Sequence, residues 1–538
     1  MLWHETIRRP RVEVPDLIQR LTLPRLHEWA YLVWPAIALY LTVAVLLIYQ
    51  HHMVVSDAWS RVVSAYSVLY SRDPHLAAIG FVWSPLPAIV LIPLMPLHAI
   101  WPGLVADGFA ASLVSALAMG AAVYQFHGML IDWRLPRVLR IVATLLFALN
   151  PMTVLFGANG NTEGLFVLFL VIAARYLSRW MERPTLGALV VTGTTLALAY
   201  LTRYEAVAAG AFTTGAVAAV TYARTPGTAG TRRITAIADG LIVGIPVVGA
   251  FLMWAGASWL ITGAPFEQFT SSYGVAAQVI AGLGVFDIDL TDFELMVQQV
   301  LGFQPLAIAI VATSMAVAAW RRDFRWLGPA MTFGAVLVFV IWAWMTGRTA
   351  GWVRYYIAVI PLGLMFAAYL LSPRRGSGPL RPSLMTAVGV LILLVVGLSS
   401  AASTARTLGD PIAGRSDLYV EGRYDLARAT SSFIDGLDAP EGAVLIDTYA
   451  GSPVVALSAR PQQFVITSDR DFPDALEDPR GAGIEYIVVP PDDGLTSLDA
   501  INRTYPGMWA NGATIGRLVG EFDSPVGETN WRVYELDQ

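Results

Sequence analysis

A few ionisable residues stand at the ends of long apolar runs. Asp57 follows the first run, and Arg61, four residues later, would share its face on a helix. A carboxylate within hydrogen-bond reach of a hydroxyl is a natural general base, so Asp57 is a catalytic candidate. A surface ion pair between Asp57 and Arg61, worth at most ~1 kcal/mol, is the competing interpretation. His75 ends the polar stretch 71–75 and is a candidate ligand contact, although a lone histidine is more often structural.

A second carboxylate, Glu163, begins another apolar run. The polar stretch before it contains Asn159 and Asn161. An acid inside an apolar helix is costly unless it faces a cavity or a partner, which makes Glu163 a functional candidate. Helix capping is the alternative, because Asn161 or Thr162 can cap the helix and an acid favours its positive end.

Arginines occur in two further polar stretches. Arg203 and Glu205 separate two apolar runs, while Arg348, Arg354 and Tyr355 lie in a later one. Arginine suits phosphate because its planar fork donates paired hydrogen bonds and stays charged. For Arg203 and Glu205, an internal ion pair is as good an interpretation as ligand contact. No acid lies near Arg348 or Arg354 in sequence, so a phosphate partner is expected for at least one of them.

The elements that must position these residues are membrane-spanning helices. A hydrocarbon core of about 30 Å needs about 20 apolar residues per helix, and 56% of the 538 residues are hydrophobic while only 14% are charged. Cysteine is absent and every basic residue is arginine, which excludes thiol and lysine chemistry. The sequence predicts eleven spans, at 31–50, 104–127, 138–157, 162–180, 185–202, 205–223, 236–262, 301–320, 327–346, 352–371 and 384–403.

One apolar segment, Phe81–Trp101, is excluded from the spans because four prolines interrupt it, and each costs a helix interior about 3 kcal/mol. Counting it would also reverse the side on which later arginines fall. It is predicted to be an interfacial or half-buried helix.

Arginines on alternate connections predict the orientation, since short cytoplasmic loops are enriched in basic residues. The tail before Tyr31 is basic and is expected inside, whereas the stretch 265–299 has five acids and no arginine and is expected outside. An odd number of spans then places the C-terminus outside. The basic connections are the stretch 134–140, Arg175 with Arg179 and Arg183, Arg224 with Arg232 and Arg233, Arg321 with Arg322 and Arg325, and Arg374 with Arg375 and Arg381.

The composition changes after Ala405, where ten arginines face 22 acids. One helical pattern and four short β-branched or aromatic runs predict a small soluble α/β domain, and its glycines lack a phosphate-binding spacing. The expected organisation is a cytoplasmic segment 1–30, a membrane domain 31–405 and an extracytoplasmic domain 406–538. The predicted helix is 424–437 and the strands are 443–446, 463–466, 486–489 and 531–536.

These residues resemble the C-type (GT-C) superfamily of integral-membrane glycosyltransferases, particularly the mannosyltransferase-like family 39. The matching features are an acid after the first span at Asp57, a later acid at Glu163, and Arg354 and Tyr355 followed by a proline. The Asp-Pro-His stretch ending at His75, which leads toward an interfacial helix, also matches. The resemblance covers most of the chain, and implies a multispan α-helical GT-C-like fold with interfacial helices and an outer α/β domain.

The resemblance also implies roles. Asp57 would deprotonate the acceptor hydroxyl in a direct inverting displacement, and Glu163 would orient acceptor or sugar, or ligate a metal. Arg354, Arg348 or Arg203, with Tyr355, would bind the donor phosphate. The remaining candidates for substrate contact are Arg61, His75, Asn159, Asn161 and Glu205.

The expected partners are a polyprenyl-phosphate sugar donor, a glycan or glycolipid acceptor and the lipid bilayer of the plasma membrane, with no nucleic acid. Many relatives carry two adjacent acids after the first span, whereas Asp57 lies between Ser56 and Ala58. A divalent cation, Mg²⁺ or Mn²⁺, is therefore an uncertain cofactor. The motif at Glu163 favours the lipid- and glycan-directed mannosyltransferases, so mannose is the expected sugar, with another hexose or arabinofuranose as alternatives.

Two other classes of protein fit the span count. A transporter or flippase would have broken helices in paired halves with polar groups at the bilayer midplane, whereas charges here gather at one face. A membrane receptor with an outer domain is the third class, and it requires Asp57 and Glu163 to lie far apart.

Overall fold

The computed structural model describes residues 26–283, 290–349, 352–373, 384–409, 425–523 and 530–537. Most of the predicted cytoplasmic segment, the basic connection at Arg374–Arg381, the acids Asp287 and Asp289, and most of the stretch joining the two predicted domains lie outside these residues.

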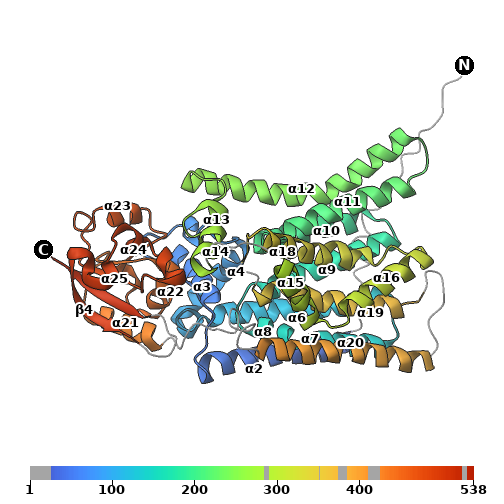
Figure 1. The fold of residues 1–538 in the computed structure, drawn as a ribbon, viewed down its shortest axis with the longest axis horizontal. Coiled ribbons are helices and arrows are strands. Elements are labelled where there is room, and N and C mark those ends of the chain that lie inside the picture. The colour runs from blue at the N-terminus through green and yellow to red at the C-terminus, as the bar shows by residue number, and fades with distance from the viewer. Residues whose placement is uncertain are drawn as a thin grey trace, which may run out of the picture.

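Long helices run side by side along the longest axis of the molecule, and a smaller α/β domain lies at one end (Figure 1). Among the described residues, eight helical segments are long and apolar enough to cross a membrane, so the chain is an integral membrane protein. They are α2 (Leu26–Val45) with η1 (Leu46–Gln50), α6 (Phe109–Asp132), α9 (Glu163–Glu182), α11 (Ala206–Arg224), α12 (Ala229–Thr262), α17 (Leu327–Pro329) with η4 (Ala330–Gly334) and α18 (Ala335–Met345), η5 (Val353–Ala358) with α19 (Val359–Leu371), and α20 (Leu384–Gly409).

Two further spans are bent pairs. Helix α7 (Arg137–Ala148) meets α8 (Pro151–Ala158) at 58°, and α15 (Leu290–Phe303) meets α16 (Ala307–Arg321) at 80°. Helix α10 (Leu186–Thr202) is also apolar but, with 17 residues, is shorter than these spans. Each of the eleven predicted spans therefore falls on one of these elements, and those predicted at 138–157 and 301–320 coincide with the two bent pairs.

Proline and polar side chains explain both bends. Pro151 begins α8, and the Asn150 side chain accepts a hydrogen bond from the amide of Met152 at 3.1 Å. At the second bend, Pro305 cannot donate to a continuing helix. The Ser400 hydroxyl of α20 donates to the Phe303 carbonyl at 2.6 Å, which supplies the partner that this carbonyl needs in an apolar environment.

The proline-interrupted segment forms short helices, as predicted. Helix α4 (Leu86–Leu91) has six residues and the 3₁₀ helix η3 (Ile92–Ala99) that follows it has eight. Together they have fewer residues than the roughly 20 that a membrane-spanning helix needs. They follow α3 (Ser56–Tyr70) and η2 (Leu76–Ile79), and precede α5 (Gly103–Ala106).

The C-terminal domain is built on a five-stranded sheet in the order β2-β1-β3-β5-β4. Strands β1 (Val444–Ile446), β2 (Phe464–Ile466) and β3 (Tyr486–Val489) are parallel, whereas β5 (Trp531–Leu536) runs antiparallel between β3 and β4 (Gly516–Phe522). The four predicted strands are confirmed, but β4 escaped prediction because its exposed, glycine-containing run lacks a buried alternation. The helices of this domain are α21 (Asp425–Gly436), α22 (Thr448–Leu457), α23 (Phe472–Glu477), α24 (Ala500–Thr504) and α25 (Met508–Asn511), with short 3₁₀ turns η7 (Pro461–Gln463), η8 (Gly494–Leu498) and η9 (Gly512–Thr514).

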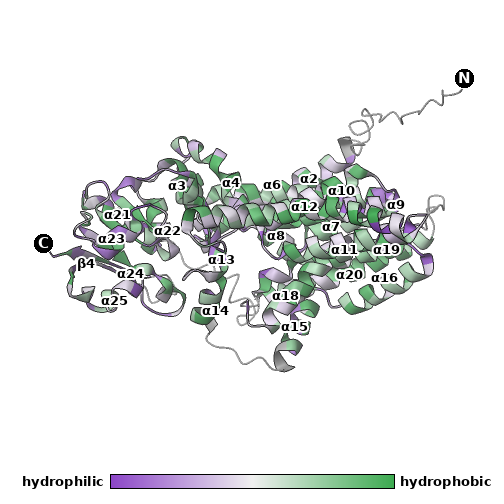
Figure 2. Ribbon diagram, turned by 90° about the horizontal axis from the view of Figure 1, so that it is seen from above, coloured by the Kyte–Doolittle hydropathy of each residue, from purple (hydrophilic) through white to green (hydrophobic). Residues whose placement is uncertain are grey.

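An apolar cluster joins the two parts of the molecule. Trp59 and Val62 of α3 belong to one buried cluster with Val454 of α22 and Trp531 of β5. The long helices are mainly apolar while the C-terminal domain mixes polar and apolar residues (Figure 2). Burial of α3 against both parts fixes the domain over the ends of the spans.

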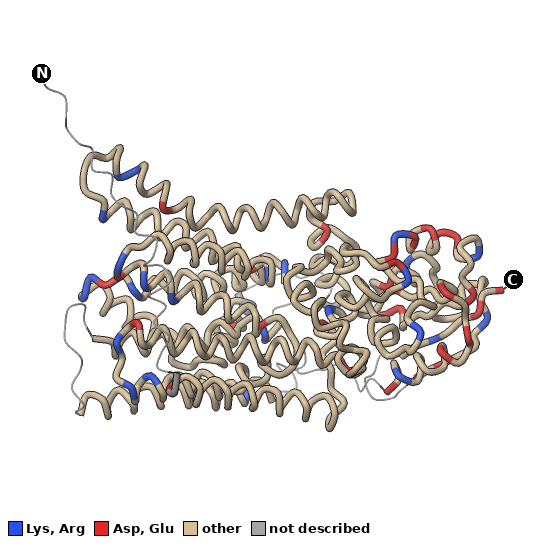
Figure 3. Tube along the Cα trace, turned by 180° about the vertical axis from the view of Figure 1, so that it is seen from behind, with Lys and Arg blue, Asp and Glu red and all other residues tan. Residues whose placement is uncertain are grey.

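Charged residues gather at the two ends of the molecule (Figure 3). Arginines concentrate at the end of the helices far from the C-terminal domain, including Arg183 after α9 and Arg224 at the end of α11. Only a few charges lie along the helices, near the junction with the C-terminal domain.

Candidate active site

A cavity of about 760 Å³ lies between the ends of the membrane helices and the C-terminal domain. Asp57, His75, Asn161 and Arg354 line it from the helical part. Aromatic rings and hydroxyl groups supply much of the remaining wall, which favours a ligand with apolar faces and hydroxyl groups. They come from Ser56, Trp59, Ser60, Trp83, Trp352, Tyr449, Thr467, Ser468 and Thr496.

Asp57 and Arg354 form an ion pair in this cavity. Arg354 Nη1 donates to Asp57 Oδ2 at 2.7 Å, and their side chains are 8% and 19% exposed. The Arg354 guanidinium also stacks on Trp352, with its central carbon 4.0 Å from the ring centroid. Asp57 occupies the first turn of α3, whose amide groups favour negative charge.

The surroundings of Asp57 keep it ionised. Burial raises the pKa of this carboxyl group, but the charges of Arg354 and Arg61 outweigh burial and hold the pKa below its usual value. Arg61 does not pair directly with the carboxylate, because its Nη1 donates to the Asp57 backbone carbonyl at 2.7 Å. The Arg61 guanidinium lies over the Trp83 ring, 5.3 Å from its centroid. The contact between Asp57 and Arg61 is therefore a side-chain-to-backbone hydrogen bond and not the ion pair considered from the sequence.

A second charge cluster lies behind the first. Arg203, at the end of α10, pairs with Glu163 and donates to Glu205 Oε1 at 2.7 Å. The two carboxylate side chains are only 1% and 5% exposed. The Tyr355 ring lies 5.0 Å from the Arg203 guanidinium and 5.7 Å from that of Arg354, which links the two clusters.

Gly160 allows these clusters to approach each other. Its φ of +81° is left-handed, and an added Cβ would lie 3.0 Å from the side chains of both Ala58 and Ala111. The turn before Glu163 therefore packs closely on α3, next to Asp57. This contact contradicts the receptor interpretation, which requires the two acids to be distant.

The remaining predicted site residues divide into two groups. His75 and Asn161 line the cavity, and the Asn161 carbonyl accepts a hydrogen bond from Ser115 at 2.6 Å. Asn159 instead lines a separate cavity of about 40 Å³ and accepts from the Asn161 amide at 3.1 Å.

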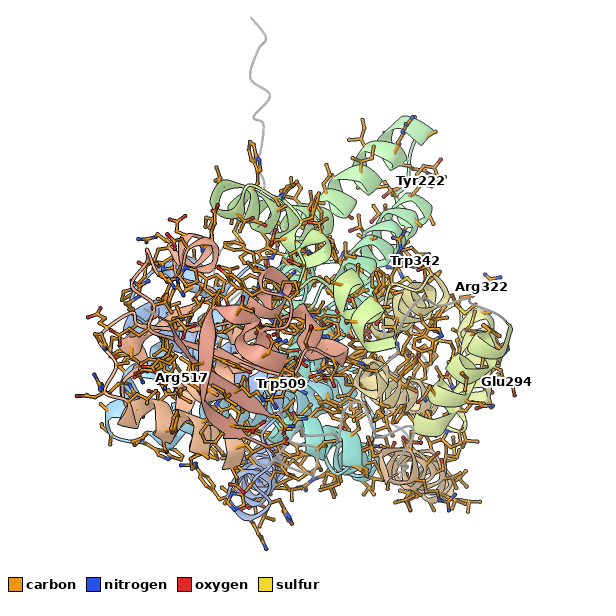
Figure 4. The ribbon with its side chains drawn as sticks, turned by 60° about the vertical axis from the view of Figure 1, so that its left-hand side comes forward. Tyr222, Glu294, Arg322, Trp342, Trp509 and Arg517 are labelled. Carbon is orange, nitrogen blue, oxygen red and sulfur yellow. The ribbon has the colours of Figure 1, made fainter. Side chains whose placement is uncertain are left out.

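Arg348 is exposed and lies outside the large cavity. It stacks on Trp342 at 5.2 Å. Trp342 lies to one side of the C-terminal domain, which carries Trp509 and Arg517 (Figure 4).

Metal ligands are not grouped here. Among the described residues, no three or more His, Asp or Glu side chains are close enough to hold a metal ion. Asp57, Glu163 and Glu205 are each engaged by an arginine instead. The residues around the cavity therefore do not fit a metal site built from these side chains.

The C-terminal domain contributes two further acidic residues, which were not predicted as site residues. Asp447 directly follows β1, and its Oδ2 accepts from the Tyr273 hydroxyl at 2.7 Å; Tyr273 lies between α13 (Glu267–Thr270) and α14 (Val275–Leu283). Asp469 follows β2 and lines the same cavity. Acids within three residues of the end of a buried parallel strand could have indicated these positions, because ligands bind at the carboxyl edge of such sheets.

Comparison with known proteins places the fold. No protein-family model matches the chain, and no curated protein matches it. ArnT from Cupriavidus metallidurans, solved bound to undecaprenyl phosphate, is 12% identical, with a TM-score of 0.55 over 94% of this chain and 97% of its own.

Two weaker matches are the apo oligosaccharyltransferase of Archaeoglobus fulgidus and the arabinofuranosyltransferase AftD from Mycobacteria. The oligosaccharyltransferase is 14% identical, with a TM-score of 0.44 over 96% of this chain and 75% of its own. AftD is 16% identical, with a TM-score of 0.43 over 94% of this chain and 41% of its own. The likeness to ArnT extends over nearly the whole of both chains and shows that this protein has the fold of the GT-C glycosyltransferases.

Proposed function

We propose that the protein transfers a sugar from a polyprenyl-phosphate carrier to a glycan or glycolipid acceptor, with inversion at the sugar carbon. The observation that carries this proposal is the Asp57–Arg354 pair in a cavity rich in aromatic and hydroxyl groups. The ArnT likeness supports it, because that structure is described as bound to undecaprenyl phosphate.

Asp57 is the general base of this reaction. It takes the proton of the acceptor hydroxyl, whose oxygen forms a bond to the sugar carbon as the bond to the carrier phosphate oxygen breaks. Arg354 stabilises the negative charge of the departing phosphate, and its contact with the Trp352 ring holds its guanidinium in place.

Arg354 therefore serves two anions in turn. While it pairs with Asp57, it lowers the pKa of that carboxyl group and weakens it as a base. A donor phosphate that engages Arg354 removes part of this stabilisation, so the pKa of Asp57 rises toward the range useful for catalysis. Donor binding in this way prepares the base for the acceptor.

Glu163 and Glu205 act through Arg203. Their ion pairs fix the Arg203 guanidinium, which contacts the Tyr355 ring. This second charge cluster thereby supports the Asp57–Arg354 pair from the side away from the cavity. The hydroxyl-rich edge of the C-terminal sheet forms the acceptor side of the cavity. The sugar is mannose in this proposal, because the motif at Glu163 resembles that of lipid- and glycan-directed mannosyltransferases. Another hexose or arabinofuranose is the alternative.

The proposed orientation places the C-terminal domain and the cavity on the outer face of the plasma membrane. The arginines at the far ends of α9 and α11 support this orientation through the positive-inside rule. The basic N-terminal tail is then cytoplasmic, and residues 31–405 and 406–538 act as the membrane and outer domains.

A transporter is the second candidate, and the two bent spans are the observation in its favour. Their breaks, however, are closed by protein groups such as Asn150 and Ser400. The charged cavity lies instead at the junction with the C-terminal domain, which favours the transferase.

The test is sugar transfer by detergent-purified protein, using radiolabelled polyprenyl-phosphate mannose and a membrane glycolipid extract. Wild type should form labelled product, and Asp57→Asn should lose roughly 10²–10⁴-fold of this activity while remaining folded. Asp438→Asn is the matched control, because Asp438 is 90% exposed on the C-terminal domain. Equal activity in all three proteins would remove Asp57 from catalysis. No transfer with mannose, glucose or arabinofuranose donors would contradict the transferase, and substrate uptake into vesicles would then be measured.

A further inference from the structure

The turn after α3 docks on the C-terminal domain through reciprocal charge pairs. Arg72 pairs with Asp471 and lies 3.4 Å from Asp469 Oδ2. In the opposite sense, Asp73 pairs with Arg470, at 3.2 Å between Oδ1 and Nη1. An Arg-Asp sequence in the helical part thus faces an Arg-Asp sequence in the loop after β2.

Two bonds from residue 470 hold the Asp73 carboxylate, and they differ in strength. Its Oδ2 accepts from the backbone amide of Arg470 at 3.1 Å. The Arg470 side chain is 69% exposed whereas that of Asp73 is 22% exposed, so solvent screens the side-chain pair. A charged acceptor on a backbone amide is the stronger contact.

Asp73 in turn holds His75. The Asp73 carbonyl accepts a hydrogen bond from His75 Nδ1 at 2.7 Å, and Asp73 Oδ2 lies 3.8 Å from the same nitrogen. Pro74 stands between them and restricts Asp73 to extended backbone conformations. A proton on Nδ1 leaves Nε2 as the acceptor of the neutral ring.

His75 also lines the cavity that contains Asp57 and Arg354. A hydrogen bond at Nδ1 fixes the orientation of the imidazole ring. Nε2 of the same ring is then held in position to accept a hydrogen bond from a hydroxyl group.

We propose that Asp73 is a positioning residue, held by the C-terminal domain, that orients His75 so that its Nε2 accepts a hydrogen bond from a sugar hydroxyl in the cavity. This inference rests on the proposed transferase function for its catalytic consequence. Its structural part, the fixing of His75 by Asp73 and residue 470, stands apart from that function.

The experiment combines hydrogen exchange of residues 71–80 with transfer kinetics, using the full-length protein in detergent. Asp73→Ala removes both bonds to residue 470, and should accelerate exchange and lower kcat/KM ~10-fold or more. Asp73→Asn keeps an acceptor for the amide and should retain most of the activity. Arg517→Ala, the matched control, removes an exposed ion pair with Glu535 outside the cavity and should change either quantity by less than ~2-fold.

Epistasis separates positioning from simple docking. The double variant Asp73→Ala/His75→Ala should be no less active than His75→Ala alone, because the effect of Asp73 on transfer acts through His75. Additive losses for Asp73 and His75 in the folded protein would overturn the proposal, and so would unchanged exchange in Asp73→Ala. If the wild-type protein transfers no sugar but Asp73→Ala still exchanges faster than wild type, the proposed function is contradicted and the structural part of this inference is supported.

Discussion

Arg354 Nη1 lies 2.7 Å from Asp57 Oδ2, although 297 positions separate the two residues in the chain. This contact joins the first turn of α3 to the 3₁₀ helix before α19 and defines the charged centre of the cavity. It also ties the proposed base to the proposed phosphate ligand, so that one substitution affects both.

Replacement of Arg354 by glutamine should lower transfer by roughly 10²–10³-fold, because a fixed donor to the leaving phosphate is lost. The charge of Arg354 is the largest influence that lowers the pKa of Asp57, so its removal raises that pKa. The acidic limb of the kcat/KM–pH profile should consequently move to higher pH. An unmoved limb in an active variant would show that the profile does not report Asp57.

Replacement of Arg203 by alanine should destabilise the protein rather than only reduce transfer. Glu163 and Glu205 would keep nearly buried charges without their shared partner, which typically costs about 3–5 kcal/mol. The thermal unfolding temperature in detergent is the measurement. Adding Glu163→Gln and Glu205→Gln should recover much of the loss, and a failure to recover would mean that the buried charges are not its cause.

Replacement of Arg348 by alanine should leave transfer within ~2-fold of wild type. Its exposed guanidinium stacks on Trp342 and lies outside the cavity, so only a surface contact of about 0.5–1 kcal/mol is lost. Donor KM is the sensitive quantity here. A large rise in the KM for the donor would instead show that Arg348 contributes to donor phosphate binding.

Asp469 should make stability depend on pH. Burial is the main cause that raises the pKa of this carboxyl group to about 6 from 3.8. Because the unfolded chain releases this proton at lower pH than the folded one, stability falls as pH rises from 4 to 6, by roughly 2 kcal/mol.

Asp469→Asn removes this dependence. The variant should gain unfolding temperature relative to wild type between pH 4 and pH 7, as measured by thermal unfolding in detergent. Asp438→Asn, on an exposed carboxylate, is the control and should show no such trend. A constant difference between Asp469→Asn and wild type across this range would contradict the raised pKa.

Local sequence pattern was enough to predict the spanning helices and four of the five strands. Spans need about 20 apolar residues whatever they pack against, and the short strands are buried β-branched runs bounded by turn residues. The two bends were not predicted, because the apolar pattern continues through them. They occur where Asn150-Pro151 and Gln304-Pro305 interrupt the helices. Strand β4 is largely exposed and so lacks the apolar signal of its neighbours.

The residue pattern was enough to predict a membrane bundle with a soluble C-terminal domain, and to select Asp57, Glu163, Arg203 and Arg354 as candidates. Burying charge in an apolar helix end is costly enough to identify such residues one at a time. The long-range partners follow from the packing of distant segments: Arg354 pairs with Asp57, and Arg203 pairs with Glu163 as well as with its neighbour Glu205. Pairing depends on helix rotation and on close approaches such as that at Gly160. The cavity wall from the C-terminal domain arises only when segments far apart in the chain pack together, which no local pattern records.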